Sequence, residues 1–204
     1  MSILNANQFA LIPKKLSSPY FGDNIIMRYG VEGDGTCFFY SLCAILNIDN
    51  FVNQPLKRQI EIGREFRCGI TQGLSWEEWQ TFVQTNNIDT SDMYEDMDTL
   101  KAALCSHEKW ADEPMIRFVM NKFKINLLFL DESLNKLYCG VSETDSTMTG
   151  IIYWLDRSHF EPLARLNALD VHNDKVALQF QFLHTTDHEF VQHLMTKYGY
   201  QCHL

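Results

Sequence analysis

The 204-residue sequence has no apolar run that approaches the roughly 20 residues needed to cross a bilayer. Residues 1–10 also lack the basic and then apolar build of a secretory signal. We therefore expect a soluble intracellular protein with no membrane partner. Its compartment would be the cytoplasm, or the host cytoplasm if the chain comes from a virus or an intracellular bacterium.

Paired cysteines are also lacking. None of the cysteines forms a CxxC pair, which argues against a zinc ribbon or a thioredoxin-like motif. Their scatter and low density are typical of reduced thiols rather than of a disulfide framework. The six positions are Cys37, Cys43, Cys68, Cys105, Cys139 and Cys202.

Basic residues are the minority charge, with 17 Lys and Arg against 26 Asp and Glu, which gives a formal net charge of −9. A nucleic-acid partner normally requires a basic face, so we expect none. Hydrophobic residues at 46% and charged residues at 21% lie near globular averages, which argues against disorder. The length fits one domain, and we expect a monomer.

Hydrophobic periodicity predicts an α+β domain in which helices precede most of the strands. Helix signals include a proline at the start of one segment and a Ser75 to Glu78 capping box. The expected helices cover residues 37–50, 55–69, 75–83, 92–104, 112–123 and 187–198. The expected strands cover residues 25–31, 125–130, 136–141, 151–155, 160–166 and 176–183.

A glycine turn leads into Cys37, at the predicted start of an apolar helix. A thiol there lies near the positive end of the helix dipole and near unpaired N–H groups, which favour the thiolate. The same N–H groups could receive a developing oxyanion. Cys37 is therefore a candidate nucleophile, and the alternative is a small buried core residue.

His159 is the best candidate for a base among the seven histidines. It follows a strongly apolar strand, where a rigid sheet can hold a side chain that stays open to substrate. An imidazole can accept the thiol proton and later protonate the leaving amine. Glu161 lies two residues on, on the same face of an extended segment, and could orient the ring. The alternative is a loop histidine that only bonds to backbone.

Three blocks of the sequence resemble the ovarian-tumour (OTU) family of cysteine proteases, most of which are deubiquitinating enzymes. The first is Asp34-Gly35-Thr36-Cys37-Phe38-Phe39, similar to the nucleophile box of the family. The others are Trp110-Ala111-Asp112-Glu113 with the helix and strand that follow, and Ile151-Ile152-Tyr153-Trp154-Leu155 followed by His159-Phe160. The blocks bracket residues 25–166 in the order of the family.

The resemblance implies a papain-like OTU fold, a small central sheet flanked by helices, with no cofactor and no metal. Residues 1–22 would be an N-terminal arm, 23–204 the catalytic domain, and 167–204 an extension. It implies Cys37 as nucleophile, His159 as base, and cleavage of the isopeptide bond after the C-terminal glycine of ubiquitin. Partners would be ubiquitin, polyubiquitin chains or ubiquitin-like modifiers. The oxyanion hole would use backbone N–H groups of Asp34, Gly35, Thr36 and Cys37.

One position departs from the family pattern, because Asp or Asn usually follows the histidine by two residues and this chain has Glu161. Asp34 could then shape the turn or act as an alternative acidic partner. The departure also motivates a second hypothesis, a ubiquitin- or protein-binding module of the same fold without efficient catalysis. A third is a metal protein that uses His184, His188 and His193, against which a solvated C-terminal helix face is the favoured reading.

Overall fold

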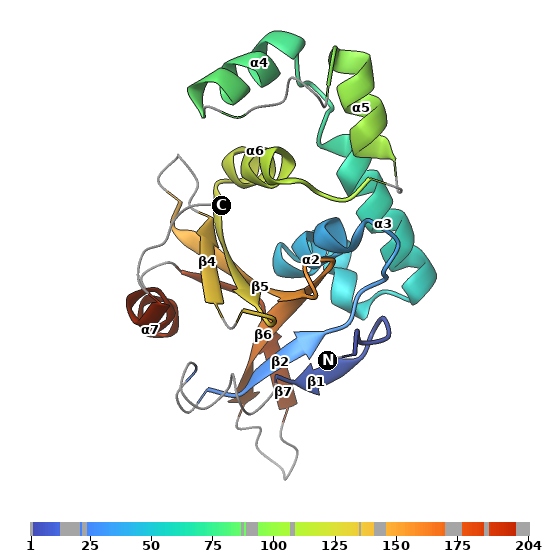
Figure 1. Cartoon of the computed structure of the whole chain (residues 1–204). Helices are drawn as coiled ribbons and strands as arrows, with labels where there is room; N and C mark the ends of the chain where they lie inside the picture. Colours follow the sequence, from blue (N-terminus) through green and yellow to red (C-terminus); the bar gives the residue numbers. More distant parts are fainter. Residues whose placement is uncertain are drawn as a thin grey trace.

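The computed structural model describes residues 2–12, 21, 24–86, 88, 94–106, 109–134, 136–140, 146–169, 177–185 and 188–198. Figure 1 shows a helical region at the top and right, a sheet below it, and one central helix between the two. None of the described helices is long and apolar enough to cross a membrane. Cys202 and the predicted element starts at Asp92, Val176 and Asp187 lie outside the described residues.

A mixed sheet forms the base of the molecule, with strand order β1-β2-β6-β5-β3-β4. β7 pairs with β6, and β8 pairs with β5. Among the described strand pairs, β3 and β5 are parallel and the rest are antiparallel. The strands are β1 Phe9–Leu11, β2 Ile26–Tyr29, β3 Ile125–Asp131, β4 Lys136–Gly140, β5 Met148–Leu155, β6 His159–Leu169, β7 Ala177–Gln181 and β8 Leu183–Thr185.

The structure describes six helices, and some of them begin at capping signals that the sequence shows. Ser75 forms a complete capping box with Glu78, and Asp112 caps the helix that has Pro114 in its first turn. The helices are α2 Cys37–Ile45, α3 Leu56–Gly69, α4 Trp76–Thr85, α5 Met97–Cys105, α6 Glu113–Phe123 and α7 Glu189–Tyr198, with a short 3₁₀ helix at Ile48–Asn53.

The sheet is buried on both faces, because alternate residues of its central strands enter different cores. Phe129 joins the cluster with α2, α3 and α6, whereas Leu128 and Leu130 join the cluster with α7. α2 has every residue buried, so it is a central helix with no solvated face. This burial fixes the N-terminal end of α2 against the sheet.

The predicted α+β class is confirmed, and the element order agrees closely with the sequence pattern. The expectation of reduced thiols is wrong at one pair, since Cys68 and Cys105 form a disulfide with their Cα atoms 4.5 Å apart. These residues come from the C-terminal ends of α3 and α5, which pack together. The two cysteines are 37 positions apart in the sequence, so no local spacing pattern predicts the disulfide. Cys37 and Cys43 are free.

Candidate active site

α2 places Cys37 beside the strand that carries His159. The Cys37 thiol interacts with the backbone N–H of Phe160, and Ser41 Oγ donates to the Phe160 carbonyl oxygen at 3.2 Å. Cys37 and Ser41 are one helical turn apart, so α2 turns both side chains toward the main chain of Phe160. The structure therefore brings the candidate nucleophile next to the residue that follows the candidate base.

Phe160 is itself held by aromatic neighbours. Its ring stacks on Trp154 at 5.8 Å and meets Phe38 and Phe129 edge-on at 5.7 and 6.0 Å. Such contacts favour one ring position beyond the area that they bury. The main chain at the start of β6 is thus fixed from the α2 face of the sheet.

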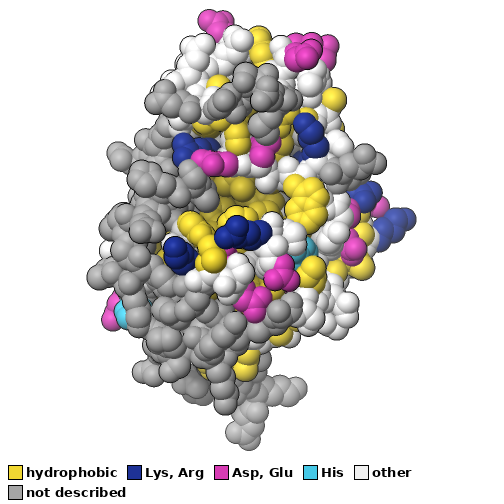
Figure 2. All heavy atoms as spheres, in the orientation of Figure 1, with side chains coloured by type: hydrophobic (Ala, Val, Ile, Leu, Met, Phe, Trp, Pro, Cys, Tyr) yellow, Lys and Arg dark blue, Asp and Glu magenta, His cyan; other side chains and the backbone are white. Residues whose placement is uncertain are grey.

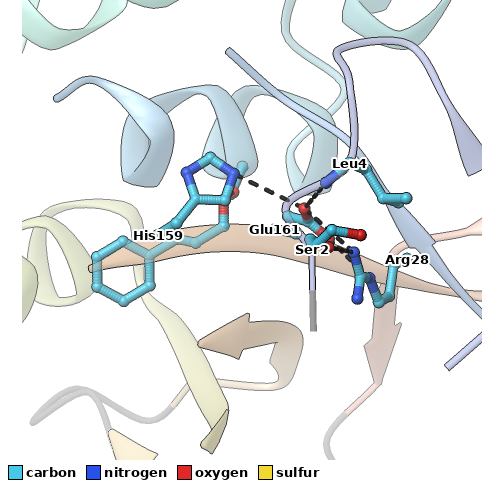
Figure 3. Close-up of polar contacts among 7 residues, drawn as sticks. Ser2, Leu4, Arg28, His159 and Glu161 are labelled. Carbon is cyan, nitrogen blue, oxygen red and sulfur yellow. Dashed lines mark hydrogen bonds and ion pairs between the residues drawn. The ribbon is translucent and has the colours of Figure 1, made fainter. Parts of the chain in front are cut away.

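The His159 ring has its two nitrogens facing different groups. A Cβ built on Gly33 would lie 3.8 Å from Cε1 and 3.9 Å from Nδ1, so this edge faces the segment that leads to Cys37. Nε2 faces Glu161 Oε1 at 3.7 Å, as Figure 3 shows. Among the described residues, no hydrogen-bond partner reaches Nε2. Nδ1 therefore lies toward Gly33, and Nε2 toward the carboxylate.

Glu161 is fully buried and is shared between several partners. Arg28 Nε lies 2.8 Å from Oε2, and the Leu4 N–H donates to Oε1 at 2.9 Å. Burial raises the Glu161 pKa, while Leu4 and Arg28 act against that rise. The carboxylate faces His159 but takes its direct bonds from other residues.

Asp34 does not contact His159. Its Oδ1 accepts the Thr36 N–H at 3.1 Å, and its Oδ2 accepts from Tyr40 and Arg64 at 3.0 and 2.8 Å. Burial opposes ionisation of Asp34, but these donors together hold its pKa below the ordinary value. Of its two predicted roles, this arrangement supports turn shaping and gives no support to a role as partner of the histidine.

The four backbone N–H groups proposed for the oxyanion hole differ in whether they already have a hydrogen-bond acceptor. The Thr36 N–H is engaged by Asp34, whereas Gly35 has a φ of +80°, which only glycine adopts readily. The Gly35 carbonyl accepts from Arg67 Nη1 at 3.0 Å. The turn is therefore fixed at both Gly35 and Thr36.

Arg67 is a buried cation that sequence reasoning missed. Its guanidinium donates to Gly35 of the nucleophile turn, to Ala103 and Leu104 of α5, and to the Lys109 carbonyl. It also lies 4.9 Å from the centre of the Phe39 ring. Arg28 was missed as well, although an arginine inside the apolar 25–31 segment is a signal for a buried ion pair.

Burial sets the ionisation of the two central groups. It raises the pKa of the Cys37 thiol to about 11, with the Asp34 carboxylate adding to the rise and the Phe160 and Phe38 amides opposing it. Burial and then the Arg28 cation lower the pKa of His159 to about 4. In the ligand-free state at neutral pH, both side chains are therefore uncharged.

A hollow opens beside Phe160, between β3 to β6 and the start of α6. Its volume is about 370 Å³. Figure 2 shows on this face a hollowed apolar area with acidic and basic side chains around it. The hollow is lined by Ala111, Glu113, Ile116, Phe129, Asp131, Tyr138, Trp154, Arg157 and Phe160.

The C-terminal histidine site that we weighed as an alternative is wrong in its premise, and the favoured reading of a solvated helix face is also wrong at His184, which is a buried strand residue. His184 lies in β8 and His188 precedes α7, so the two do not share a helix face. His184 is buried against Phe190, and its ring centre is 5.7 Å from that of His188. Within the described residues, no group of three or more His, Cys, Asp or Glu side chains could hold a metal ion.

Comparison with solved structures finds OTU domains. An OTU domain in complex with ubiquitin superposes with a TM-score of 0.55 at 11% identity, over 95% of this chain and 90% of that chain. A Hazara virus OTU bound to ubiquitin gives a TM-score of 0.48 at 14% identity, over 72% and 85%. An OTU deubiquitinase from Wolbachia pipientis wMel gives 0.44 at 19% identity, over 70% and 90%.

No protein-family model and no curated protein matches the sequence. The fold assignment therefore depends on the arrangement of elements, which extends over nearly the whole of both chains in the ubiquitin-bound neighbour. The three motif blocks lie on that fold at the start of α2, at the start of α6 and across β5 and β6. This chain has the fold of an OTU domain.

Proposed function

We propose that the protein is a ubiquitin-directed cysteine protease that hydrolyses the isopeptide bond after the C-terminal glycine of ubiquitin. The observation that carries the proposal is that α2 packs on β6, where Ser41 donates to the Phe160 carbonyl oxygen and the Cys37 thiol lies near the Phe160 amide, next in the chain to His159. The OTU fold and neighbours whose structures contain ubiquitin support the same reading. The hollow beside Phe160 offers room for an extended peptide segment.

The first step is proton transfer coupled to attack. Because the thiol and the imidazole are both neutral at rest, His159 acts as a general base as the sulfur approaches the carbonyl carbon. The S–C bond forms, the thiol proton moves to Nδ1, and the carbonyl electrons move to oxygen. Amides of the turn that ends at Cys37 receive this oxyanion.

The second half of the reaction restores the protein. The oxyanion collapses, the C–N bond breaks, and the proton on His159 goes to the leaving lysine amine, which leaves a thioester on Cys37. Water then gives a proton to His159 and attacks the thioester, and the thiol recovers that proton when the C–S bond breaks. Glu161 stabilises the imidazolium that exists between these transfers.

The test is a ubiquitin probe with an electrophilic C-terminus. The wild type should become labelled, and Cys37→Ala should not. Labelling of Cys37→Ala to the same extent would remove Cys37 from its role. In a diubiquitin panel, His159→Ala should lose nearly all turnover while its circular dichroism stays unchanged, and normal cleavage by that variant would defeat the dyad.

A second candidate is a ubiquitin-binding module of the same fold with weak or absent catalysis. It is favoured by the nearly complete burial of Cys37, which is 2% exposed, and by the 3.7 Å separation of His159 Nε2 from Glu161. Tight ubiquitin binding without cleavage of any chain type would select this candidate. Cleavage that depends on Cys37 would eliminate it.

The intracellular location and the monomeric state are part of the proposal. Partners are ubiquitin, its chains or ubiquitin-like modifiers, and the proposed chemistry needs no cofactor. The predicted division into an arm, residues 1–22, and a catalytic domain, residues 23–204, stays a prediction. In the structure β1 of that arm pairs with β2 and so belongs to the sheet.

A further inference from the structure

The N-terminal arm reaches the candidate active site through its main chain. The Leu4 N–H donates to Glu161 Oε1 at 2.9 Å, and the Ser2 carbonyl accepts from Arg28 Nη2 at 3.1 Å. Figure 3 shows these groups gathered on the side of Glu161 away from the His159 ring. A segment far from His159 in sequence thus contacts the same carboxylate that the histidine faces.

The described part of the arm, residues 2–12, is also held by the segment that follows Leu4. Register pairing places Phe9 opposite Tyr29, and two backbone hydrogen bonds, Asn7 N–H to Gly30 O and Gly30 N–H to Gln8 O, measure 3.0 and 2.8 Å. Gly30 is the point of closest approach, since a Cβ there would lie 2.2 Å from the Asn5 carbonyl oxygen. Residues 2–12 of the arm therefore have a defined position on the sheet.

The two Glu161 oxygens have different jobs. Oε2 pairs with Arg28 Nε at 2.8 Å. Oε1 accepts from the Leu4 N–H at 2.9 Å and from Arg28 Nη2 at 3.5 Å, and it is the oxygen that lies 3.7 Å from His159 Nε2. Arg28, Glu161 and His159 are 2%, 0% and 2% exposed, so water does not take the place of a lost donor without rearrangement. The oxygen that faces the imidazole therefore has its shortest hydrogen bond from the arm, with Arg28 as a second and more distant donor.

We propose that Leu4, through its main-chain N–H, and Arg28 are positioning residues that hold the Glu161 carboxylate in place to orient His159. The inference rests on the proposed function, because it assigns these residues a part in the same reaction. Glu161 has one methylene more than the Asp or Asn usual in OTU proteases and so one more torsion to fix. Two donors from one side fix it, because a buried carboxylate turns toward the N–H groups that it accepts from.

Other charged groups surround the same carboxylate. Tyr153 of β5 lies opposite Glu161 in the sheet register, and the Arg28 guanidinium lies 5.2 Å from the centre of its ring. Glu132, which follows β3, adds a like charge that favours protonation of Glu161, whereas Leu4 and Arg28 oppose it. Loss of the Leu4 donor therefore makes protonation of Glu161 easier, and the acid limb of activity moves to higher pH.

The experiment replaces the Leu4 N–H. Leu4→Pro removes the donor, and Leu4→Ala keeps it. Ile3→Pro is the matched control, because it puts a proline at the exposed position of the arm that precedes Leu4. With a fluorogenic ubiquitin C-terminal conjugate, Leu4→Pro should lower kcat about tenfold, the worth of one charge-assisted hydrogen bond, with KM unchanged. The acid limb of its pH profile of kcat/KM should move to higher pH. Leu4→Ala should recover most of the loss, and Ile3→Pro should match the wild type.

Gly30→Ala is a second variant that displaces the arm without a proline. Its φ is not in the left-handed region, so the expected effect comes from the contact with Asn5 rather than from backbone strain. Like Leu4→Pro, it should lower kcat relative to the wild type. Wild-type kcat and an unshifted acid limb in both variants would overturn the inference.

A nitrogen NMR measurement of the His159 ring separates this inference from the proposed function. The wild type should hold the proton on Nε2, and Leu4→Pro should lower the population of that tautomer while Leu4→Ala keeps it. If the wild type neither reacts with the ubiquitin probe nor turns over conjugates, the proposed function fails and the tautomer still decides the inference. An identical tautomer in wild type and Leu4→Pro would refute it.

Discussion

Burial of a neutral His159 makes the stability of the protein depend on pH, and the size of that dependence follows from the structure. His159 is 2% exposed, and burial together with the Arg28 cation lowers its pKa from the ordinary 6.5 to about 4. In the unfolded chain the imidazole regains its ordinary pKa. The perturbation is a fall in pH from about 7.5 to about 5, compared between the wild type and His159→Asn.

The sign follows from proton uptake. Between pH 6.5 and pH 4, the unfolded chain binds a proton at His159 and the folded protein does not, so acid favours unfolding in this window. At about pH 5 the wild type should have lost about 2 kcal/mol of unfolding free energy through this residue alone, and about 3 kcal/mol below both pKa values. Above about pH 7 the contribution is close to zero.

Urea denaturation followed by tryptophan fluorescence measures the effect. The unfolding free energy of the wild type should fall between the two pH values by about 2 kcal/mol more than that of His159→Asn. His184→Asn is a matched control at a second buried histidine, where burial, then His188 and then Arg165 lower the pKa to about 4. It should flatten the pH dependence by a similar amount.

The comparison also has a clear negative outcome. If the wild type and His159→Asn lose the same free energy on acidification, His159 titrates normally in the folded protein. The neutral resting dyad would then be wrong, and the thiol would face an imidazolium already at mildly acid pH.

Three other changes test separate parts of the structure. Asp34→Asn keeps an oxygen for the Thr36 N–H and should retain most of the ubiquitin-conjugate turnover, whereas Asp34→Ala should lose about tenfold, and equal loss in both would make the charge essential. Gly63→Ala would put a Cβ 2.0 Å from Tyr40 Cδ1 and should cost about 1–3 kcal/mol in urea denaturation, so an unchanged midpoint would contradict this packing. Cys68→Ser should lower the unfolding free energy by about 2–4 kcal/mol relative to the wild type under oxidising conditions, and should not lower it in reductant. If the variant and the wild type are equally stable under oxidising conditions, the disulfide does not form in solution.

The sequence predicted those parts of the fold whose signals are local. The Ser75 capping box, the proline at the start of α6 and the apolar run of β3 each depend on residues next to one another, and all three elements are present. The full burial of α2 was not predicted, because the order of strands and helices around it depends on contacts distant in sequence. Bounds differ most at the end of α2, which is Ile45 where residue 50 was predicted, and at the start of α5, which is Met97 where residue 92 was predicted.

The candidate site divides in the same way. Cys37, His159 and Glu161 carry reactive side chains in recognisable local settings, and sequence reasoning found them. The contact of Leu4 with Glu161 uses a backbone N–H across 157 positions, so no side chain in the arm indicates it. Arg67 was missed for a related reason, since its acceptors are mainly carbonyl oxygens, which every residue has.

The hydrogen bonds of Arg67 couple the position of the nucleophile turn to that of α5. Its guanidinium links the nucleophile turn to the C-terminal end of α5 and to Lys109. The adjacent disulfide between Cys68 and Cys105 joins α3, which carries Arg67, to α5 covalently. A ligand that pulls α5 outward must either strip a buried cation of its acceptors or drag Gly35 along with the helix. The turn beside Cys37 therefore feels the displacement of a helix that lies outside the sheet and touches no reacting atom.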